Sequence, residues 1–364
     1  MRGLLALEDG TTFAGEAFGG TGVRAVGEVV FNTGMTGYQE VLTDPSYAGQ
    51  IVAMTYPLIG NYGIDPAESE SRRPWANGFI IRQNCEVPSH WGDRTHLGRY
   101  LAENGILGLA GVDTRALTRH LRRHGTLRGV ICAGPSVAVA DAVDEARRWQ
   151  PDGLVEQVTG PVAKRLSTGF PEVVVIDYGA KENIARSLLA LGAGVSVVPA
   201  HATAAEILAL HPDGVLLSNG PGDPREVADA PRTIGALLEA GVPLFGICLG
   251  HQLLGLALGA KTEKMLFGHR GSNHPVIDLR SGLGVITTQN HGYALIPESL
   301  DPAVVEITHE NLNDRTVEGI RHRYLPAFAV QYHPEACPGP GDSRNLFREF
   351  IDLCRAQRGA RAAV

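Results

Sequence analysis

The 364-residue sequence has no apolar run long enough to cross a membrane, and two acidic residues, Glu8 and Asp9, come before a signal-peptide core could form. It has only five cysteines, an odd number at irregular spacing, which argues against a disulfide framework. We therefore expect a cytoplasmic protein whose thiols stay reduced.

The sequence also lacks a strong excess of charge of one sign. Its 32 Lys and Arg against 39 Asp and Glu give a net charge of −7, which argues against nucleic acid or an anionic membrane as the main partner. Hydrophobic residues at 44% and charged residues at 20% are typical of a soluble globular enzyme. The length is sufficient for two domains, each with its own core.

Strand and helix patterns alternate regularly in the second half of the chain. Strands are predicted at 173–176, 195–198, 214–217 and 242–247, with helices at 183–191, 203–210, 233–240 and 249–258. Such alternation predicts βαβ units and a doubly wound, mostly parallel α/β sheet, which we place at residues 172–360. Short strands at 276–279, 284–287, 304–307 and 327–330 are expected to extend the sheet antiparallel, before a last helix at 345–355.

The first 150 residues have a different pattern. Short strands such as 27–31 and 51–54 and a regular helix at 114–124 predict a separate α+β domain over residues 1–150. Residues 151–171 are rich in turn residues and are interpreted as a linker. Four arginines of the first domain either face an acidic partner or form a solvated helix face: Arg119, Arg122, Arg123 and Arg128.

Cys248 lies where the strand at 242–247 meets the helix at 249–258, between Gly246 and Gly250. This is the pattern of a nucleophile elbow, in which a tight turn exposes the reactive atom above the sheet and the helix N-terminus favours the thiolate. Further along, His333 and Glu335 offer a base and a carboxylate to orient it. The three residues together predict Cys-His-Glu acyl transfer.

The other cysteines fit that chemistry less well. We interpret three of them as packing residues, because their segments lack the glycine-flanked strand-to-helix turn of a catalytic cysteine: Cys85, Cys132 and Cys354. Cys337 is the rival nucleophile, but its Pro/Gly-rich loop offers no strand-turn-helix context to lower the thiol pKa.

The glycine-rich loop 218–224 follows a strand and is expected at the same sheet edge as Cys248. A phosphate cradle fits poorly, because Pro221 and Pro224 remove N–H donors and no Gly-Lys-Ser/Thr follows. An oxyanion hole fits better, with N–H groups from Leu249 and from Gly220 or Gly222. A purely structural turn remains the alternative.

These motifs, with Asn290-His-Gly-Tyr293, resemble the class I (triad) glutamine amidotransferases. In the N-terminal half, Asn32–Glu40, Thr43–Tyr47, Thr55–Pro57 and Val112–Arg115 resemble the domain found only in the small subunit of glutamine-dependent carbamoyl-phosphate synthetase. The resemblance covers nearly the whole chain, and its motifs occur together and in order.

The resemblance implies a role for each matching residue. Cys248 is then the nucleophile, His333 the base and Glu335 its orienting carboxylate, with Gly220 and Leu249 as oxyanion donors. The implied glutamine-binding positions are Ser46, Gly220, Gly222, Leu249, Gln252, Asn290, Gly292 and Tyr293. Ser46 belongs to the N-terminal domain, so the site is expected at the domain interface.

The resemblance also implies the partner and the cofactors. Ammonia released from glutamine would pass to a large subunit that makes carbamoyl phosphate from bicarbonate and ATP, and the N-terminal domain would be the docking surface. No metal or cofactor is expected on this chain, with ATP and divalent metal on the large subunit. Three alternatives remain open: an amidotransferase for another acceptor, a stand-alone cysteine hydrolase, and a protein that kept the fold without the chemistry.

Overall fold

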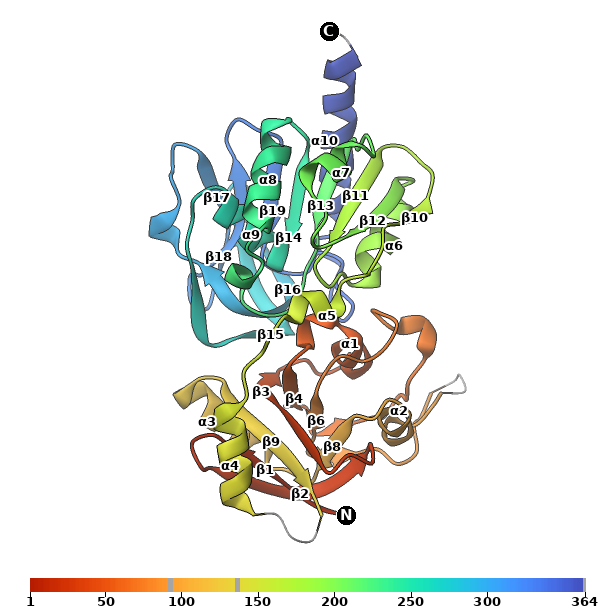
Figure 1. The fold of residues 1–364 in the computed structure, drawn as a ribbon, viewed down its shortest axis with the longest axis vertical. Coiled ribbons are helices and arrows are strands. Elements are labelled where there is room, and N and C mark those ends of the chain that lie inside the picture. Colours follow the sequence, from red (N-terminus) through yellow and green to blue (C-terminus); the bar gives the residue numbers. More distant parts are fainter. Residues whose placement is uncertain (91–93, 135–137, 363–364) are drawn as a thin grey trace. The chain divides into compact units, whose positions relative to one another are not determined.

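The computed structural model describes residues 1–90, 94–134 and 138–362, and it divides into two compact units, Met1–Leu154 and Val155–Val364 (Figure 1). No helix in the described residues is long and apolar enough to cross a membrane.

The first unit is built on a closed β-barrel, with strands in the order β1-β2-β8-β6-β4-β3-β9. The barrel strands are β1 (Arg2–Leu7), β2 (Thr12–Gly19), β3 (Arg24–Asn32), β4 (Gln50–Met54), β6 (Gly78–Ile80), β8 (Leu107–Ala110) and β9 (Leu127–Ala133). A separate two-stranded sheet pairs β5 (Leu58–Ile59) with β7 (Gln83–Asn84). The separate α+β domain expected from the sequence is thus a closed barrel with helices. The pattern of short strands did not predict that the sheet closes into a barrel.

Among the described residues of the first unit, the α-helices beside the barrel are α1 (Tyr38–Thr43), α2 (Leu97–Glu103), α3 (Thr114–His124) and α4 (Val139–Arg148). Helix α3 has the predicted bounds, because the Asp113 carboxylate caps it by accepting from Ala116 N at 2.9 Å and Gly125 ends it at φ 91°. Of the four arginines discussed above, Arg128 lies on β9 and pairs with Glu8 at 2.5 Å, apart from the exposed arginines of α3.

The second unit contains a ten-stranded sheet in the order β10-β12-β11-β13-β14-β19-β18-β17-β15-β16. Its strands are β10 (Lys164–Ser167), β11 (Glu172–Asp177), β12 (Gly194–Pro199), β13 (Gly214–Leu217), β14 (Leu244–Ile247), β15 (Thr262–Asp278), β16 (Gly284–Leu295), β17 (Val305–Asn311), β18 (Val317–His322) and β19 (Ala327–Val330). Strands β12, β11, β13, β14 and β19 pair in parallel, and the remaining pairings are antiparallel.

Helices cover both faces of this sheet (Figure 1). They are α5 (Leu154–Val158), α6 (Glu182–Ala190), α7 (Ala204–Leu208), α8 (Ala230–Glu239), α9 (Leu249–Ala257) and α10 (Asn345–Ala362). Alternate residues of β11 enter different cores: Val174 and Ile176 pack with α7, α8 and α9, whereas Val173 and Val175 pack with α6 and α10. This two-sided burial confirms the doubly wound sheet.

The largest difference from the sequence prediction lies after α9. Strands β15 and β16 form a hairpin that begins at Thr262, well before the predicted strand at 276, and β18 was not predicted at all. Polar residues interrupt the apolar alternation in these strands, so their pattern is weak. In the expected linker 151–171, α5 is a short helix and β10 is hydrogen-bonded to β12, so this segment contributes to the second unit.

We predict that Gly250→Ala destabilises the second unit, whereas Gly235→Ala does not. A Cβ on Gly250 would lie 2.2 Å from Leu217 O, but nothing lies within 4 Å of a Cβ on Gly235 in α8. Urea unfolding should show a loss of about 2 kcal/mol for Gly250→Ala and a gain of about 0.5 kcal/mol for Gly235→Ala. Equal stability of the two variants would contradict the close packing of the turn.

Candidate active site

Cys248 occupies a strained turn between β14 and α9. Its backbone has φ 53° and ψ −103°, a region that non-glycine residues rarely adopt. Neighbouring strands hold the turn: Cys248 N donates to Val330 O at 2.9 Å, and Gly250 N donates to Ser218 O at 3.0 Å. The thiol-bearing residue is 2% exposed. The tight strand-to-helix turn predicted at Cys248 is therefore present, and the role of its thiol as a nucleophile stays a prediction.

The glycines around the turn are required by close backbone packing. A Cβ on Gly246 would meet Gly250 O at 2.6 Å. A Cβ on Gly220, in the loop after β13, would meet Tyr178 O at 2.2 Å and the Leu249 side chain at 2.8 Å. The two predicted oxyanion donors, Gly220 and Leu249, are thus neighbours, and Leu249 begins α9, where an N–H has no partner within the helix.

The sheet order explains why distant motifs meet. Strands β13, β14 and β19 are consecutive and parallel, so their carboxyl ends lie at one edge of the sheet. The loop 218–224 follows β13, Cys248 follows β14, and His333 and Glu335 follow β19.

His333 and Glu335 form a buried ion pair, with His333 Nδ1 2.6 Å from Glu335 Oε1. Burial opposes a charge on the imidazole, but Glu335 and the Cys248 thiol outweigh it and raise the pKa of His333 to about 10. Burial alone would raise the pKa of Glu335, but Lys181 and His333 lower it to about 2. The raised pKa of His333 favours transfer of the Cys248 proton to the imidazole, which then pairs with the Glu335 carboxylate.

Lys181 is a site residue that sequence reasoning missed. It lies just before α6, only 2% of its side chain is exposed, and its Nζ is 3.1 Å from Glu335 Oε1 and 2.5 Å from Ala336 O. Its backbone N donates to Asn219 Oδ1 at 3.0 Å, which connects it to the loop after β13. The sequence feature that could have indicated this residue is a lysine soon after a predicted parallel strand, and that feature alone is a weak indicator of a site residue.

Strand β16 brings three of the predicted glutamine-binding residues to the elbow. The Cys248 thiol lies 3.5 Å from Asn290 O. Gln252 Nε2 donates to Tyr293 O at 2.8 Å and to Gln331 Oε1 at 3.0 Å, so α9 is tied to β16 and to the segment after β19. Gly292 follows Asn290 on the same strand.

Tyr293 also reaches the loop after β13. Burial raises the pKa of Asp223, but hydrogen bonds from Arg225 and from Tyr293 outweigh that effect and lower it. Gly222 in this loop has φ 86°, a left-handed conformation that suits glycine. The loop, the elbow and β16 are thus connected by direct contacts within the second unit.

The first unit holds one predicted site residue, and the other cysteines can now be compared with their predicted roles. Ser46 belongs to the first unit, in a short 3₁₀ turn capped by Asp44, and its predicted contribution to the site stays a prediction. Cys337 has φ 47° in the loop after Glu335. Cys132 and Cys354 are buried in apolar cores, as expected for packing residues, but Cys85 is only partly buried and its thiol donates to Val87 O at 3.2 Å.

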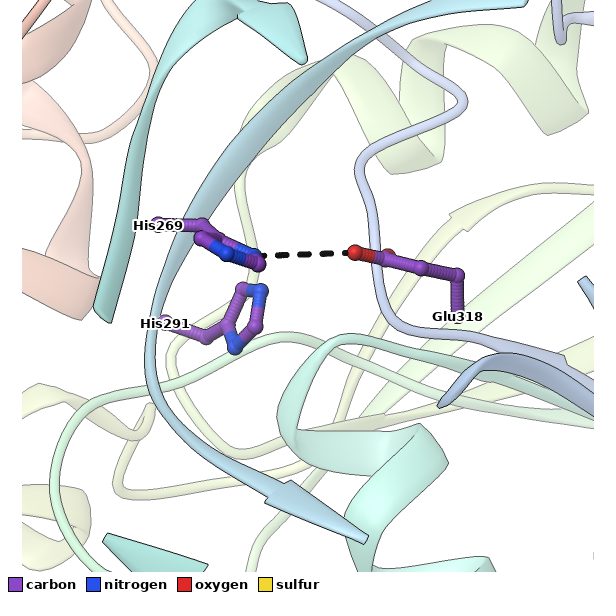
Figure 2. A group of neighbouring side chains, drawn as sticks. All are labelled: His269, His291 and Glu318. Carbon is purple, nitrogen blue, oxygen red and sulfur yellow. Dashed lines mark ion pairs between the residues drawn. The ribbon is translucent and has the colours of Figure 1, made fainter. Parts of the chain in front are cut away.

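One group of potential metal ligands occurs among the described residues: His269, His291 and Glu318 (Figure 2). They were not singled out from the sequence, because they come from three strands that the weak β pattern did not place together. At the elbow itself lie a thiol, an imidazole, a carboxylate and backbone N–H groups, which are the group types that acyl transfer requires.

Comparison with known proteins agrees with this geometry. Residues 174–353 match the family of class-I glutamine amidotransferases, and residues 5–131 match the CPSase domain of the carbamoyl-phosphate synthase small chain. A carbamoyl phosphate synthase small chain from Symbiobacterium thermophilum is 56% identical over 95% of this chain and 97% of that protein. The chain belongs to the carbamoyl-phosphate synthase small chain family.

Other relatives in this family are similar over the same length. A small chain from Bacillus caldolyticus is 54% identical over 98% of this chain and 97% of that protein. A pyrimidine-specific small chain from Bacillus subtilis is 50% identical over 97% of this chain and 96% of that protein. A solved structure from Thermoplasma acidophilum, described as a GMP synthase component, is 26% identical over 52% of this chain and 97% of that chain, but its TM-score of 0.47 is too low to add support.

For this family member, we predict that Lys181→Met shifts the acid limb of activity. Without the ammonium group, the pKa of Glu335 rises, so Glu335 becomes protonated, and kcat/KM for glutamine falls, at a higher pH than in the parent. Because the buried carboxylate also loses a partner, the free energy of unfolding should fall by about 3 kcal/mol. The exposed Lys261→Met is the matched control. An unchanged acid limb would show that Lys181 does not hold Glu335 ionised.

Proposed function

We propose that this chain is the glutaminase subunit of a carbamoyl-phosphate synthetase, hydrolysing glutamine to glutamate and ammonia. The observation that carries the proposal is that the strained Cys248 and the His333–Glu335 pair lie at one edge of the sheet. The Cys248 thiol there lies 3.5 Å from the carbonyl oxygen of Asn290, a predicted substrate-binding residue. Full-length similarity to small chains of carbamoyl phosphate synthase supports the same conclusion.

In the first step, His333 takes the thiol proton and Cys248 attacks the side-chain amide carbon of glutamine. The carbonyl π electrons move to the oxygen, which the N–H groups of Gly220 and Leu249 stabilise. The intermediate then expels nitrogen, which takes the proton from His333 and leaves as ammonia. A glutamyl thioester on Cys248 remains.

In the second step, His333 removes a proton from water as the oxygen attacks the thioester carbon. Collapse of the second intermediate expels the Cys248 thiolate and gives glutamate. Glu335 contributes throughout by orienting the His333 imidazole and stabilising it when it is protonated, and Lys181 holds Glu335 in turn. His333 Nδ1 lies 2.6 Å and Lys181 Nζ 3.1 Å from Glu335 Oε1.

A large subunit is the proposed consumer of the ammonia. The relatives are named as small chains, which implies a large one, and the two families matched here occur in order along this chain. The first unit is proposed as the docking surface, and ATP and divalent metal are assigned to the large subunit. Ser46 is proposed to contribute from the first unit to glutamine binding.

An elbow thiol with a histidine and a carboxylate also occurs in cysteine hydrolases, so glutamine specificity is the discriminating property. Gln252 Nε2 is already engaged by Tyr293 and Gln331, which leaves its Oε1 to accept from a substrate ammonium group. Good turnover of esters or peptides without turnover of glutamine would favour the stand-alone hydrolase.

We predict that Cys248→Ser lowers glutamine hydrolysis by about a thousandfold or more, because serine is a much weaker nucleophile in a site built for a thiolate. Cys337→Ser, which removes the rival thiol, should leave the rate within about threefold. The measurement is glutamate release by the purified chain with an added large subunit.

The acceptor is tested in the same assay by following carbamoyl phosphate. We expect the large subunit to raise the glutaminase rate and carbamoyl phosphate to appear, and we expect Cys248→Ser to retain synthesis from added ammonia. Glutamate release that is unaffected by the large subunit, with no carbamoyl phosphate, would preserve the triad chemistry and refute the assigned acceptor.

A further inference from the structure

Buried polar residues on strand β16 and on its neighbours β15 and β18 form a second cluster, which the mechanism above does not use. His291 on β16 lies opposite His269 on β15 in the antiparallel register, and their ring centroids are 5.0 Å apart. Glu318 on β18 points toward them (Figure 2). Each histidine is 5% exposed and Glu318 is 0% exposed. Burying such groups costs free energy unless they are paired, so the partners that compensate for their burial have to be identified.

Glu318 is the centre of this set. Its Oε1 accepts from Gln289 Nε2 at 2.9 Å and from Asn311 Nδ2 at 2.8 Å, and it lies 3.6 Å from His269 Nδ1. Its backbone oxygen accepts from Gln331 N at 2.9 Å. One residue thus joins β15, β16, β17, β18 and the segment after β19.

His269 supplies the positive charge for this carboxylate. Its Nε2 is 2.8 Å from Asp314 Oδ2, while its Nδ1 faces Glu318. Burial opposes a charge on His269, but Asp314 and Glu318 outweigh it and raise the pKa of His269 to about 9. Burial, followed by the charge on His269, lowers the pKa of both neighbouring rings, His274 and His291, and the Arg270 guanidinium adds to the effect on His291. The imidazolium is therefore held between two carboxylates at neutral pH.

The set continues into the glutamine-binding part of β16. Gln289 Oε1 is 2.8 Å from His291 Nε2, and His291 Nδ1 is 2.8 Å from Tyr293 O, which also accepts from Gln252. Side chains alternate along a strand, so Gln289 and His291 share one face, and Asn290 and Gly292 face the other way. The contacts thus fix the strand from the face opposite to the predicted substrate-binding residue Asn290.

We propose that Glu318 is a positioning residue for glutamine binding: with His269 and Asp314 it holds the Gln289–Tyr293 segment of β16 in register with Cys248. The proposal rests on the proposed glutaminase function. It assigns to Glu318 an effect on binding of glutamine and not on the chemical step, because the side-chain contacts of Glu318 go to Gln289, Asn311 and His269 rather than to the triad.

A metal ion is the competing occupant, since ligand atoms of His269, His291 and Glu318 lie within 4.8 Å of one another. The contacts favour a proton on His269 Nδ1 over a metal ion at this position. A metal at His269 Nδ1 would displace the proton that pairs with Glu318, and both nitrogens of His291 already lie 2.8 Å from oxygen atoms.

The test compares Glu318→Leu, Glu318→Gln and the control Glu263→Gln, an exposed carboxylate on β15. Glu318→Leu removes the carboxylate that accepts from the buried Gln289 and Asn311 amides, so KM for glutamine should rise about tenfold with kcat within about threefold. Glu318→Gln keeps an acceptor oxygen and should restore KM at pH 7. Synthesis from ammonia in the holoenzyme should not change in any variant.

A pH profile separates positioning from a general loss of folding. As pH rises through about 9, His269 loses its proton and KM should rise. In Asp314→Asn and Glu318→Gln the pKa of His269 falls, so the rise in KM should begin at a lower pH. The α-amino group of glutamine titrates in the same range, so the shift between variant and parent is the readout.

Three results would overturn the proposal. One is a KM for Glu318→Leu equal to that of the parent, the second is a loss confined to kcat, and the third is stoichiometric zinc in the purified holoenzyme whose chelation raises KM. If the parent did not hydrolyse glutamine at all, the proposed function would fail instead, and this is seen before any variant is made. If Glu318→Leu does not fold, the pH shifts of Asp314→Asn and Glu318→Gln decide the matter.

Discussion

The site depends on one buried charge arrangement, in which the Glu335 carboxylate lies between the Lys181 ammonium and the His333 imidazole. Neither side chain of the Lys181–Glu335 pair is more than 2% exposed, so none of these charges is stabilised by water. Each is tolerated because the others are present, and removing one leaves the rest unpaired. The arrangement fixes the loop after β19 against α6 and keeps the Glu335 carboxylate ionised, so that the imidazolium formed when His333 accepts a proton is stabilised.

Backbone packing supplies the second constraint. The turn at Cys248 exists because Gly246, Gly250 and Gly220 allow three chain segments to approach within distances that a Cβ would prevent. Strain at φ 53° is maintained by hydrogen bonds from the two neighbouring strands. Close backbone packing thus positions the proposed nucleophile Cys248, and the charge pairs orient the proposed base His333.

The chemistry-bearing residues were predictable where local sequence carries the information. Strand β13 and helix α3 have their predicted bounds, and the helix predicted at 203–210 is present as α7, which a Thr203–Glu206 capping box opens, because caps, glycines and apolar periodicity act over a few residues. Lys181 and Glu318 were not predictable, since their roles arise from partners far away in the sequence or from strands with weak alternation. The barrel closure of the first unit was missed for the same reason, as strand pairing between distant segments leaves little local signal.

The central claim is that Cys248 attacks glutamine to form a thioester. The most direct measurement is acid quench of the enzyme during turnover, followed by digestion and mass spectrometry of the cysteine peptides. The account predicts a glutamyl group on the peptide containing Cys248, absent in Cys248→Ser. A glutamyl group on Cys337, or hydrolysis with no covalent intermediate in single-turnover quench, would contradict it.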